Sequence, residues 1–270
     1  MTQLITNPIE QVKPHASVDK PTYGFVSTEE ILNTFRAKGW NATSTQIGKP
    51  RKADKIGFQK HLIRLDNTTL GEIDGLTGEN ASRVQLCLVN SHDGTGALRI
   101  LWGVFRVACL NGLISGPTFR EFKAVHSKNI MQRLAEGIED MTDGMADVVD
   151  AVKKLQGSTF GADAQDAFVK SLVDARLSGI GRIISVNYAS ALYARRMQDA
   201  GTDAYTLANR VQEAIMRGGI EYVYERDVKD AQGNVTGTRV IHARTRRLQS
   251  VPAQIRLNRL VWDEALKHAA

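Results

Sequence analysis

The spacing of apolar residues changes once along this chain of 270 residues, and that change limits the possible folds more than any other feature. Up to about residue 126, apolar residues alternate or gather in short runs, most clearly at 84–89 and 97–109, which predicts β-strands. From residue 127 to 156 they recur every three or four positions, which predicts one long helix. We therefore expect an α+β fold in which an antiparallel sheet is followed by a long helix, a helical middle region and a C-terminal β-hairpin.

The same patterns place the remaining elements. Ser27 is positioned to cap a helix that ends at Gly39. We expect further strands at 40–47, 58–65 and 119–126, helices at 163–178, 187–199, 203–217 and 254–268, and hairpin strands at 222–228 and 237–243. Residues 1–21 hold three of the six prolines and little pattern, so we expect a flexible arm there. A single domain should follow over 22–270, sheet-rich at 22–126, helical at 127–218, and closed by the hairpin and terminal helix at 219–270.

Apolar stretches in this chain are short. The longest uncharged one, 107–117, is interrupted by Asn111 and Gly112, whereas a membrane-spanning helix needs about 20 apolar residues. The first 20 residues lack the apolar core of a secretory signal. These features predict a cytoplasmic protein without a membrane partner.

Positive charge is concentrated near the C-terminus. The chain carries a net charge of +6, and residues 239–259 hold six arginines and no acid. Guanidinium groups form planar, two-pronged contacts with phosphates and stack on bases, so this segment favours a nucleic-acid partner, which we take to be DNA. A solvated charged face is the alternative. The contacts that we expect are Arg239, Arg244, Arg246, Arg247 and Arg256, with Lys49, Arg51 and Lys52 of a second basic segment.

An acidic run provides the opposite charge. Residues 136–150 hold six acids and no Lys or Arg. Four of the acids fall on one helical face, but the sequence has no Glu-x-x-His motif and no second acidic helix to complete a metal site. The run is either a solvated face or an interface, and the sequence leaves the two open. Because one chain carries both a basic and an acidic segment, we expect a homo-oligomer, although the two segments could equally pair within one chain.

A polar cluster beside a predicted buried strand supplies the weak candidates for catalysis. It comprises Asn90, Ser91, His92 and Asp93. Consecutive strand residues point to opposite faces, so these residues cannot form a hydrolytic triad, and the Asp-Gly pair is typical of a hairpin turn. We retain His92, Asp93, Asn90 and His61, because loop residues on a rigid scaffold often carry function. The sequence has no metal-ligand spacing and no Walker lysine motif, so we expect no metal and no cofactor.

Several segments together resemble one known family. They are the run LVNSHDGTGA at 88–97, the run LWGVFRVACLNGL at 101–113, GFxxHLIRL at 57–65, NRxQExxxRGG at 209–219 and LNRxxW at 257–262. These motifs are similar to those of a phage- and plasmid-type family, the domain of unknown function 932, which has prophage-encoded members of similar length. The resemblance covers residues 23 to about 266. Members tend to lie in mobile elements near recombination, antirestriction and toxin genes, so the resemblance implies DNA-linked work but identifies no catalytic residue.

These observations predict a non-catalytic DNA-binding protein of a phage or mobile element. Single-strand binding or annealing in recombination is one form of that function. A nucleic-acid-processing enzyme centred on His92 and Asp93 is an alternative. A further alternative is a protein-binding anti-defence module with a host or phage protein partner, in which the acidic run imitates the charge of DNA.

Overall fold

The computed structural model describes residues 7–18, 21–50, 52–70, 82–106, 113–114 and 121–269. The chain divides into two compact units where the sequence predicts one domain. The first unit comprises Met1–Ala151 and Gln249–Ile255, and the second comprises Val152–Leu248 and Arg256–Ala270. Each unit has its own antiparallel sheet.

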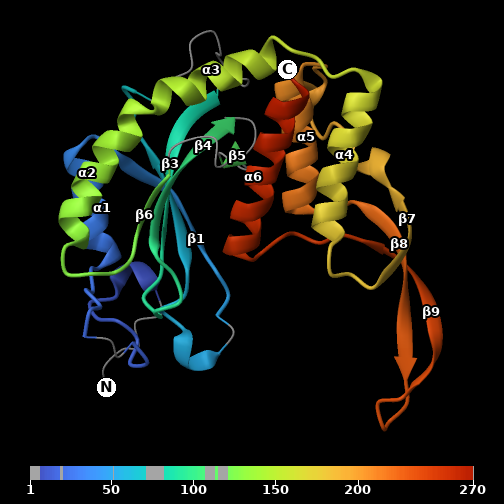
Figure 1. The fold of residues 1–270 in the computed structure, drawn as a ribbon, viewed down its shortest axis with the longest axis horizontal. Helices are drawn as coiled ribbons and strands as arrows, with labels where there is room; N and C mark the ends of the chain where they lie inside the picture. Colours follow the sequence, from blue (N-terminus) through green and yellow to red (C-terminus); the bar gives the residue numbers. More distant parts are fainter. Residues whose placement is uncertain are drawn as a thin grey trace. The chain divides into compact units, whose positions relative to one another are not determined.

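The first unit is built on a sheet in which most neighbouring strands are also consecutive in the sequence (Figure 1). Its described strands are β1 (Asn41–Ile47), β2 (His61–Asp66), β3 (Ser82–Asn90), β4 (Leu98–Arg106), β5 (Leu113–Ile114) and β6 (Phe122–Ala124). The order is β1-β2-β3-β4-β5, and β6 also pairs with β4. Side chains of β3 are buried along almost its whole length. Burial of consecutive side chains, which point to opposite faces, means that β3 is covered on both faces.

Helix α1 (Thr28–Ala37) begins where the sequence predicts it. The Ser27 hydroxyl accepts the N–H of Glu30 at 3.1 Å, which confirms the predicted cap. The helix buries Ile31, Leu32 and Phe35 completely or almost completely in the core of the first unit. Its first residue, Thr28, is also buried and points its hydroxyl toward polar side chains of the sheet.

The prediction of a single long helix over 127–156 is wrong in one respect, because the helical region is divided. It consists of two helices, α2 (Ile130–Asp143) and α3 (Met145–Gln156), with Gly144 between them. The buried stripe continues from Met141 to Val148 across this break, so the apolar spacing alone gives no sign of it.

Part of the expected flexible arm is described. Residues 7–18 include a 3-10 helix, η1 (Pro8–Glu10), and the His15 N–H donates to the backbone carbonyl of His92 at 2.9 Å. Gln11 of this segment is buried. These residues therefore pack against the first unit.

The second unit combines helices with a smaller sheet. Its helices are α4 (Ala162–Leu177), α5 (Ala204–Arg217) and most of α6 (Val251–His268), and the expected helix at 187–199 is wrong. Its first residue, Asn187, is the last residue of a strand, β7 (Arg182–Asn187). The rest of the segment contains two 3-10 helices, η4 (Tyr188–Leu192) and η5 (Met197–Asp199). The pairing of β7 with β8 joins segments that are distant in the sequence, so no local pattern predicts this strand.

A long hairpin completes the second unit. Its strands are β8 (Glu221–Lys229) and β9 (Val235–Arg244), in the order β7-β8-β9. Strand β7 pairs with β8 only as far as Glu225, so beyond that point the two hairpin strands pair with each other alone among the described residues (Figure 1). The antiparallel sheets, helices and C-terminal hairpin confirm the predicted α+β class. Among the described helices, none combines the length and apolar character needed to cross a membrane.

Candidate functional site

The outer part of the β8–β9 hairpin is exposed on both faces. We call residues 226–240 the ribbon. All of its residues are exposed except Asp230, which is half-buried. A two-stranded segment that buries no apolar face gains little stability from packing. Packing in the core of the second unit therefore does not explain why the hairpin extends this far.

Two arginines lie directly opposite each other on the ribbon. Arg226 of β8 is the register partner of Arg239 of β9, so both side chains project from the same face. Neither has a carboxylate partner among the described residues. Like charges directly across a strand pair destabilise it, so the pair does not serve folding. An anionic partner would remove this repulsion.

The face that carries these arginines continues toward the base of the hairpin with aromatic rings. Tyr222 and Tyr224 occupy alternate positions of β8 before Arg226, and their ring centroids are 5.6 Å apart. Both tyrosines are half-buried. Beyond the arginines, Val228 is 45% exposed. The face thus joins guanidinium, aromatic and apolar groups and carries no acid.

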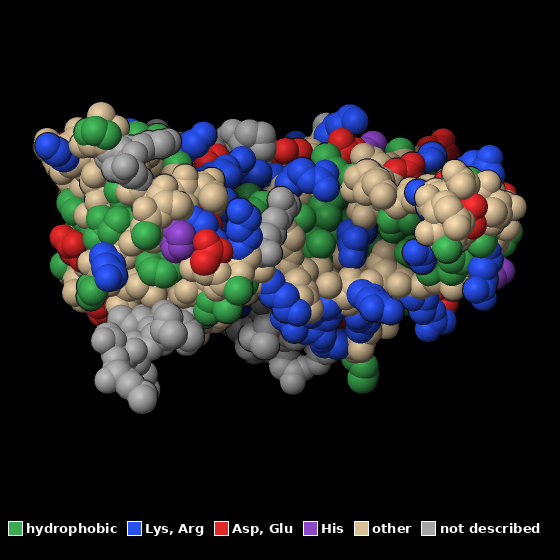
Figure 2. All heavy atoms as spheres, turned by 90° about the horizontal axis from the view of Figure 1, so that it is seen from below, with side chains coloured by type: hydrophobic (Ala, Val, Ile, Leu, Met, Phe, Trp, Pro, Cys, Tyr) green, Lys and Arg blue, Asp and Glu red, His purple; other side chains and the backbone are tan. Residues whose placement is uncertain are grey.

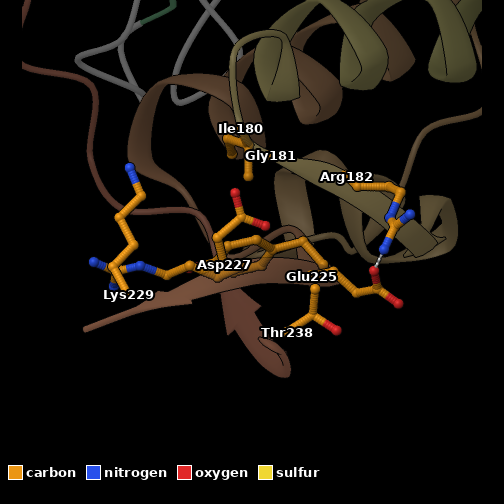
Figure 3. Close-up of a pocket in the computed structure, with 9 residues that line it drawn as sticks. Ile180, Gly181, Arg182, Glu225, Asp227, Lys229 and Thr238 are labelled. Carbon is orange, nitrogen blue, oxygen red and sulfur yellow. Dashed lines mark ion pairs between the residues drawn. The ribbon is translucent and has the colours of Figure 1, made fainter. Parts of the chain in front are cut away.

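An open groove follows the edge of β8 near its junction with β7 (Figure 3). Its basic lining residues are Arg182, Arg226 and Lys229, and its acidic ones are Glu225 and Asp227. Arg182 and Glu225 point toward each other and form an ion pair, as the dashed line in Figure 3 shows. Arg226 and Lys229 remain available to an anion at the ribbon end of the groove.

The other predicted arginines do not all remain available. Arg244 forms an ion pair with Glu221, so one of the expected nucleic-acid contacts is neutralised within the protein. Arg246 and Arg247 are exposed in the segment after β9, and Arg256 is exposed on α6. None of these three has an ion pair within the parts of the chain that are described.

The second basic segment lies in the first unit. Lys49 and Lys52 line a cavity of about 770 Å³ together with residues around them in the fold. Both lysines are exposed and have no ion pair among the described residues. The remaining predicted contact, Arg51, lies outside the residues that the structure describes.

The weak candidates for catalysis meet in a buried polar cluster of the first unit. The Nε2 atoms of His61 and His92 each lie 2.9 Å from the Thr28 hydroxyl oxygen, and Asn90 donates to the same oxygen at 3.1 Å. His126 Nε2 lies 3.0 Å from the side-chain carbonyl of Asn90. Thr28, His61, Asn90 and His92 are all 0% exposed, and His126 is 7% exposed. The cluster therefore links helix α1 to the sheet from inside the fold.

The hydrogen bonds determine which nitrogen carries the proton in each neutral imidazole. His61 Nδ1 lies 3.1 Å from the Gln59 backbone carbonyl, so it must donate, and His61 Nε2 must accept the Thr28 hydroxyl proton. His92 Nε2–H then donates to Thr28, and His126 Nε2–H donates to Asn90. Thr28 thereby donates one hydrogen bond and accepts two, which uses the full capacity of its hydroxyl group.

Burial keeps these imidazoles neutral. Loss of hydration lowers the pKa of His61 to about 4. It lowers the pKa of His92 to about 3, with further lowering from the neighbouring His61 and His126. Burial also lowers the pKa of His126. Neutral, hydrogen-bonded and inaccessible side chains of this kind stabilise a fold, and no substrate can reach them without opening it.

Asp93 has a different role from its neighbour His92. Its carboxylate accepts the backbone N–H of Thr95 at 3.0 Å and the Thr95 hydroxyl at 2.6 Å, as expected for a turn residue. Gly94 follows with a φ of 73°. Among the described residues, no group of three or more His, Cys, Asp or Glu side chains could hold a metal ion.

The acidic run lies on α2 and α3 with every one of its acids exposed. Glu139 accepts a hydrogen bond from Lys38 of the same unit at 2.6 Å. The other acids of the run are Glu136, Asp140, Asp143, Asp147 and Asp150.

Two residues that the structure makes central were not predicted from the sequence. Arg226 lies outside the arginine-rich segment, and strand register alone brings it to Arg239. Thr28 looks like an ordinary first residue of a helix, yet it organises a cluster whose other members lie 33 and 64 residues away at His61 and His92. A cross-strand pairing of the predicted hairpin would have identified Arg226.

The surface visible in Figure 2 shows more Lys and Arg side chains than Asp and Glu side chains, in keeping with the net charge of +6.

Two proteins of Escherichia coli (strain K12), the UPF0380 proteins YfjQ and YafZ, are each 27% identical to this chain over 243 residues, which is 89% of this chain and 80% of theirs. No solved structure is significantly similar. The model of the family described as "Domain of unknown function (DUF932)" matches residues 14–262. The chain therefore belongs to this family, as its motifs led us to expect.

Proposed function

We propose that this is a non-catalytic DNA-binding protein of a mobile element and that the ribbon is its principal contact with DNA. The observation that carries the proposal is the exposed pair Arg226 and Arg239, which has no carboxylate partner among the described residues and lies on a strand pair that is exposed on both faces. The origin in a mobile element rests on the family resemblance alone.

The dimensions and chemistry of the ribbon suit a duplex. The major groove of B-DNA admits a two-stranded β-ribbon, and Arg makes two-pronged contacts with phosphate and with guanine. Val228, Val235 and Val240 are 45%, 57% and 53% exposed and could contact thymine methyl groups or sugars. Arg246, Arg247 and Arg256 would add phosphate contacts where they can reach the same molecule.

The single-strand form of this function has weaker support. Unstacked bases need aromatic surfaces to lie on, and the tyrosines at the base of the ribbon, Tyr222 and Tyr224, are half-buried. We therefore expect a duplex to bind more tightly than a single strand of the same length. An enzyme centred on His92 also has weak support, because that imidazole is 0% exposed.

A paired charge reversal tests the proposal. The double variant R226E/R239E should weaken binding to a 20-base-pair duplex by at least about a hundredfold, because two phosphate contacts become repulsive. The matched control is K153E/K154E, which makes the same change in net charge at two exposed lysines of α3. Fluorescence anisotropy with a labelled duplex and a labelled single strand measures both.

The control also separates a local contact from general electrostatics. Equal loss of affinity in R226E/R239E and K153E/K154E would refute the ribbon as the contact. Tighter binding of the single strand than of the duplex would favour the annealing form of the function.

A further inference from the structure

The lysine-lined cavity of the first unit is formed by segments that are distant in the sequence. Its walls come from the loop after β1, from residues before β2, from the β3–β4 turn and from the start of α6. All of these segments belong to the same compact unit. Its volume of about 770 Å³ lies within the range of roughly 300–1,000 Å³ that is usual for small-molecule sites.

The charge in this cavity is unbalanced. Four lysines line it, namely Lys49, Lys52, Lys55 and Lys60, against one acid, Asp93. Lys55 is held by His15 Nδ1 at 2.9 Å and by the Asp93 backbone carbonyl at 3.4 Å. The side chains of the other three lysines have no ion pair or hydrogen bond among the described residues. Such a concentration of one sign in a hollow attracts an anion.

The start of α6 adds to this positive character. Ser250, Val251 and Pro252 form part of the wall, and the helix that begins at Val251 is 18 residues long. Its first turn contains no acidic residue to neutralise the positive end of the helix dipole. Pro252 has no N–H and the Ala253 N–H donates to the Ser250 hydroxyl at 3.4 Å, so the start of α6 offers a phosphate mainly the positive end of its dipole.

Gln59, in the same wall, has a buried hydrogen-bond acceptor that suggests which other groups a ligand would carry. Gln59 is 9% exposed, and its side-chain carbonyl oxygen has no hydrogen-bond partner among the described residues. The oxygen is shielded from solvent, so a ligand donor would reach it once the amide turns toward the cavity, and the bond would then satisfy a buried acceptor. A nucleoside supplies hydroxyl and amino donors of the kind that this acceptor requires, at a distance from the phosphate that inorganic phosphate alone does not span.

Gly96 allows Lys60 to lie close to the β3–β4 turn. A Cβ atom at position 96 would lie 3.1 Å from Lys60 Cε and 3.3 Å from Lys60 Nζ. A side chain there would be tight against Lys60 and against the Ser91 hydroxyl, which would lie 3.0 Å from the same Cβ. The absence of a side chain at Gly96 therefore leaves room for the Lys60 amino group at the wall of the cavity.

We propose that this cavity binds a nucleoside 5′-phosphate, with the phosphate at Lys49, Lys52, Lys60 and the start of α6, and a hydroxyl or amino group of the nucleoside at Gln59. The phosphate can belong to a free nucleotide or to the 5′ end of a nucleic-acid strand, because both present the same chemistry. This inference is independent of the ribbon.

Isothermal titration calorimetry of the full chain tests the site. The probes are deoxyadenosine 5′-monophosphate, deoxyadenosine and inorganic phosphate. We expect the nucleotide to bind at least about tenfold more tightly than phosphate and the uncharged nucleoside not to bind, because both anchors are needed. No nucleotide binding at millimolar concentration, or equal binding of nucleotide and nucleoside, would overturn the proposal.

Two variants assign the roles. K49M/K60M should weaken nucleotide binding by at least about tenfold, because charge-assisted contacts are lost. Gln59→Leu should weaken nucleotide binding by about fivefold and leave phosphate binding unchanged. The control K153E/K154E should bind the nucleotide as the unaltered protein does, and melting temperatures show whether each variant is folded. Unchanged nucleotide affinity in folded K49M/K60M would refute the site.

Two more comparisons show whether the phosphate belongs to a free nucleotide or to a strand end, and whether the cavity acts independently of the ribbon. A 5′-phosphorylated single strand that binds more tightly than its 5′-hydroxyl counterpart assigns the cavity to strand ends, and equal binding of the two strands assigns it to free nucleotides. R226E/R239E should retain full nucleotide affinity. A loss there would contradict the assignment of the phosphate to the cavity.

Discussion

At the scale of single residues, the Thr28 hydroxyl determines the polar core of the first unit. Its hydrogen bonds fix the tautomers of His61 and His92, and burial keeps both imidazoles neutral. The sequence shows two histidines beside strands, and we predicted them only as weak candidates for catalysis. Their burial depends on α1 folding over the sheet, which no local pattern in the sequence reveals.

This core predicts a dependence of stability on pH. The pKa of His61 is about 4 and that of His92 about 3 when folded, against an ordinary value of 6.5, so the unfolded chain takes up these protons first as pH falls. Stability from this source is complete above pH 6.5 and declines as pH falls toward 4. Urea denaturation should show a loss of about 2 kcal/mol per histidine between pH 7 and pH 5.

The exposed His242 provides the control for that experiment. His242→Gln should follow the pH profile of the unaltered protein. A free energy of unfolding that stays constant from pH 7 to pH 5 would contradict the buried, neutral state of His61 and His92.

Gly218, between α5 and β8, is a second position where one residue decides local structure. Its φ of 88° and ψ of −171° lie in a region that is almost restricted to glycine. A Cβ atom there would lie 2.3 Å from the backbone carbonyl oxygen of Thr245. Gly218→Ala should therefore lower the free energy of unfolding by at least about 2 kcal/mol.

Gly233→Ala is the matched comparison for this variant. Gly233 also has a positive φ, of 89°, but a Cβ atom there would meet nothing within 4 Å. Chemical denaturation should show a clearly smaller loss for Gly233→Ala, which retains only the backbone strain. Equal losses in the two variants would show that the contact with Thr245 is unimportant.

At the scale of elements, the sequence predicts those whose pattern matches their final environment. The buried run of β3 and the cap of α1 are examples. The prediction fails where distant pairing decides, as in β7, or where a glycine interrupts a continuous apolar stripe, as at Gly144. The candidate site follows the same rule, because Arg239 is predicted from composition whereas its partner Arg226 follows only from strand register.

The ribbon should be dispensable for folding. Replacing residues 226–239 with an Asn-Gly turn leaves Glu225 opposite Val240 at the end of the pairing with β7. Because the removed residues are almost all exposed, the melting temperature should change by only about 2 °C or less, while duplex binding should be lost. A large drop in the melting temperature would mean that the ribbon belongs to the core.

At the scale of the whole molecule, the net charge of +6 attracts any polyanion, so binding alone does not identify a contact surface. Each phosphate that a protein neutralises releases counterions, and their number appears in the dependence of affinity on salt. The position of the charge can therefore be tested separately from its amount.

The most direct test of the ribbon as the DNA contact is the slope of log K against log salt for a 20-base-pair duplex between about 50 and 200 mM salt. We predict that R226E/R239E lowers the steepness of this slope by about 2 relative to the unaltered protein, since two phosphate contacts are lost, and that K153E/K154E leaves it unchanged. An identical slope in all three proteins would contradict the ribbon as the DNA contact.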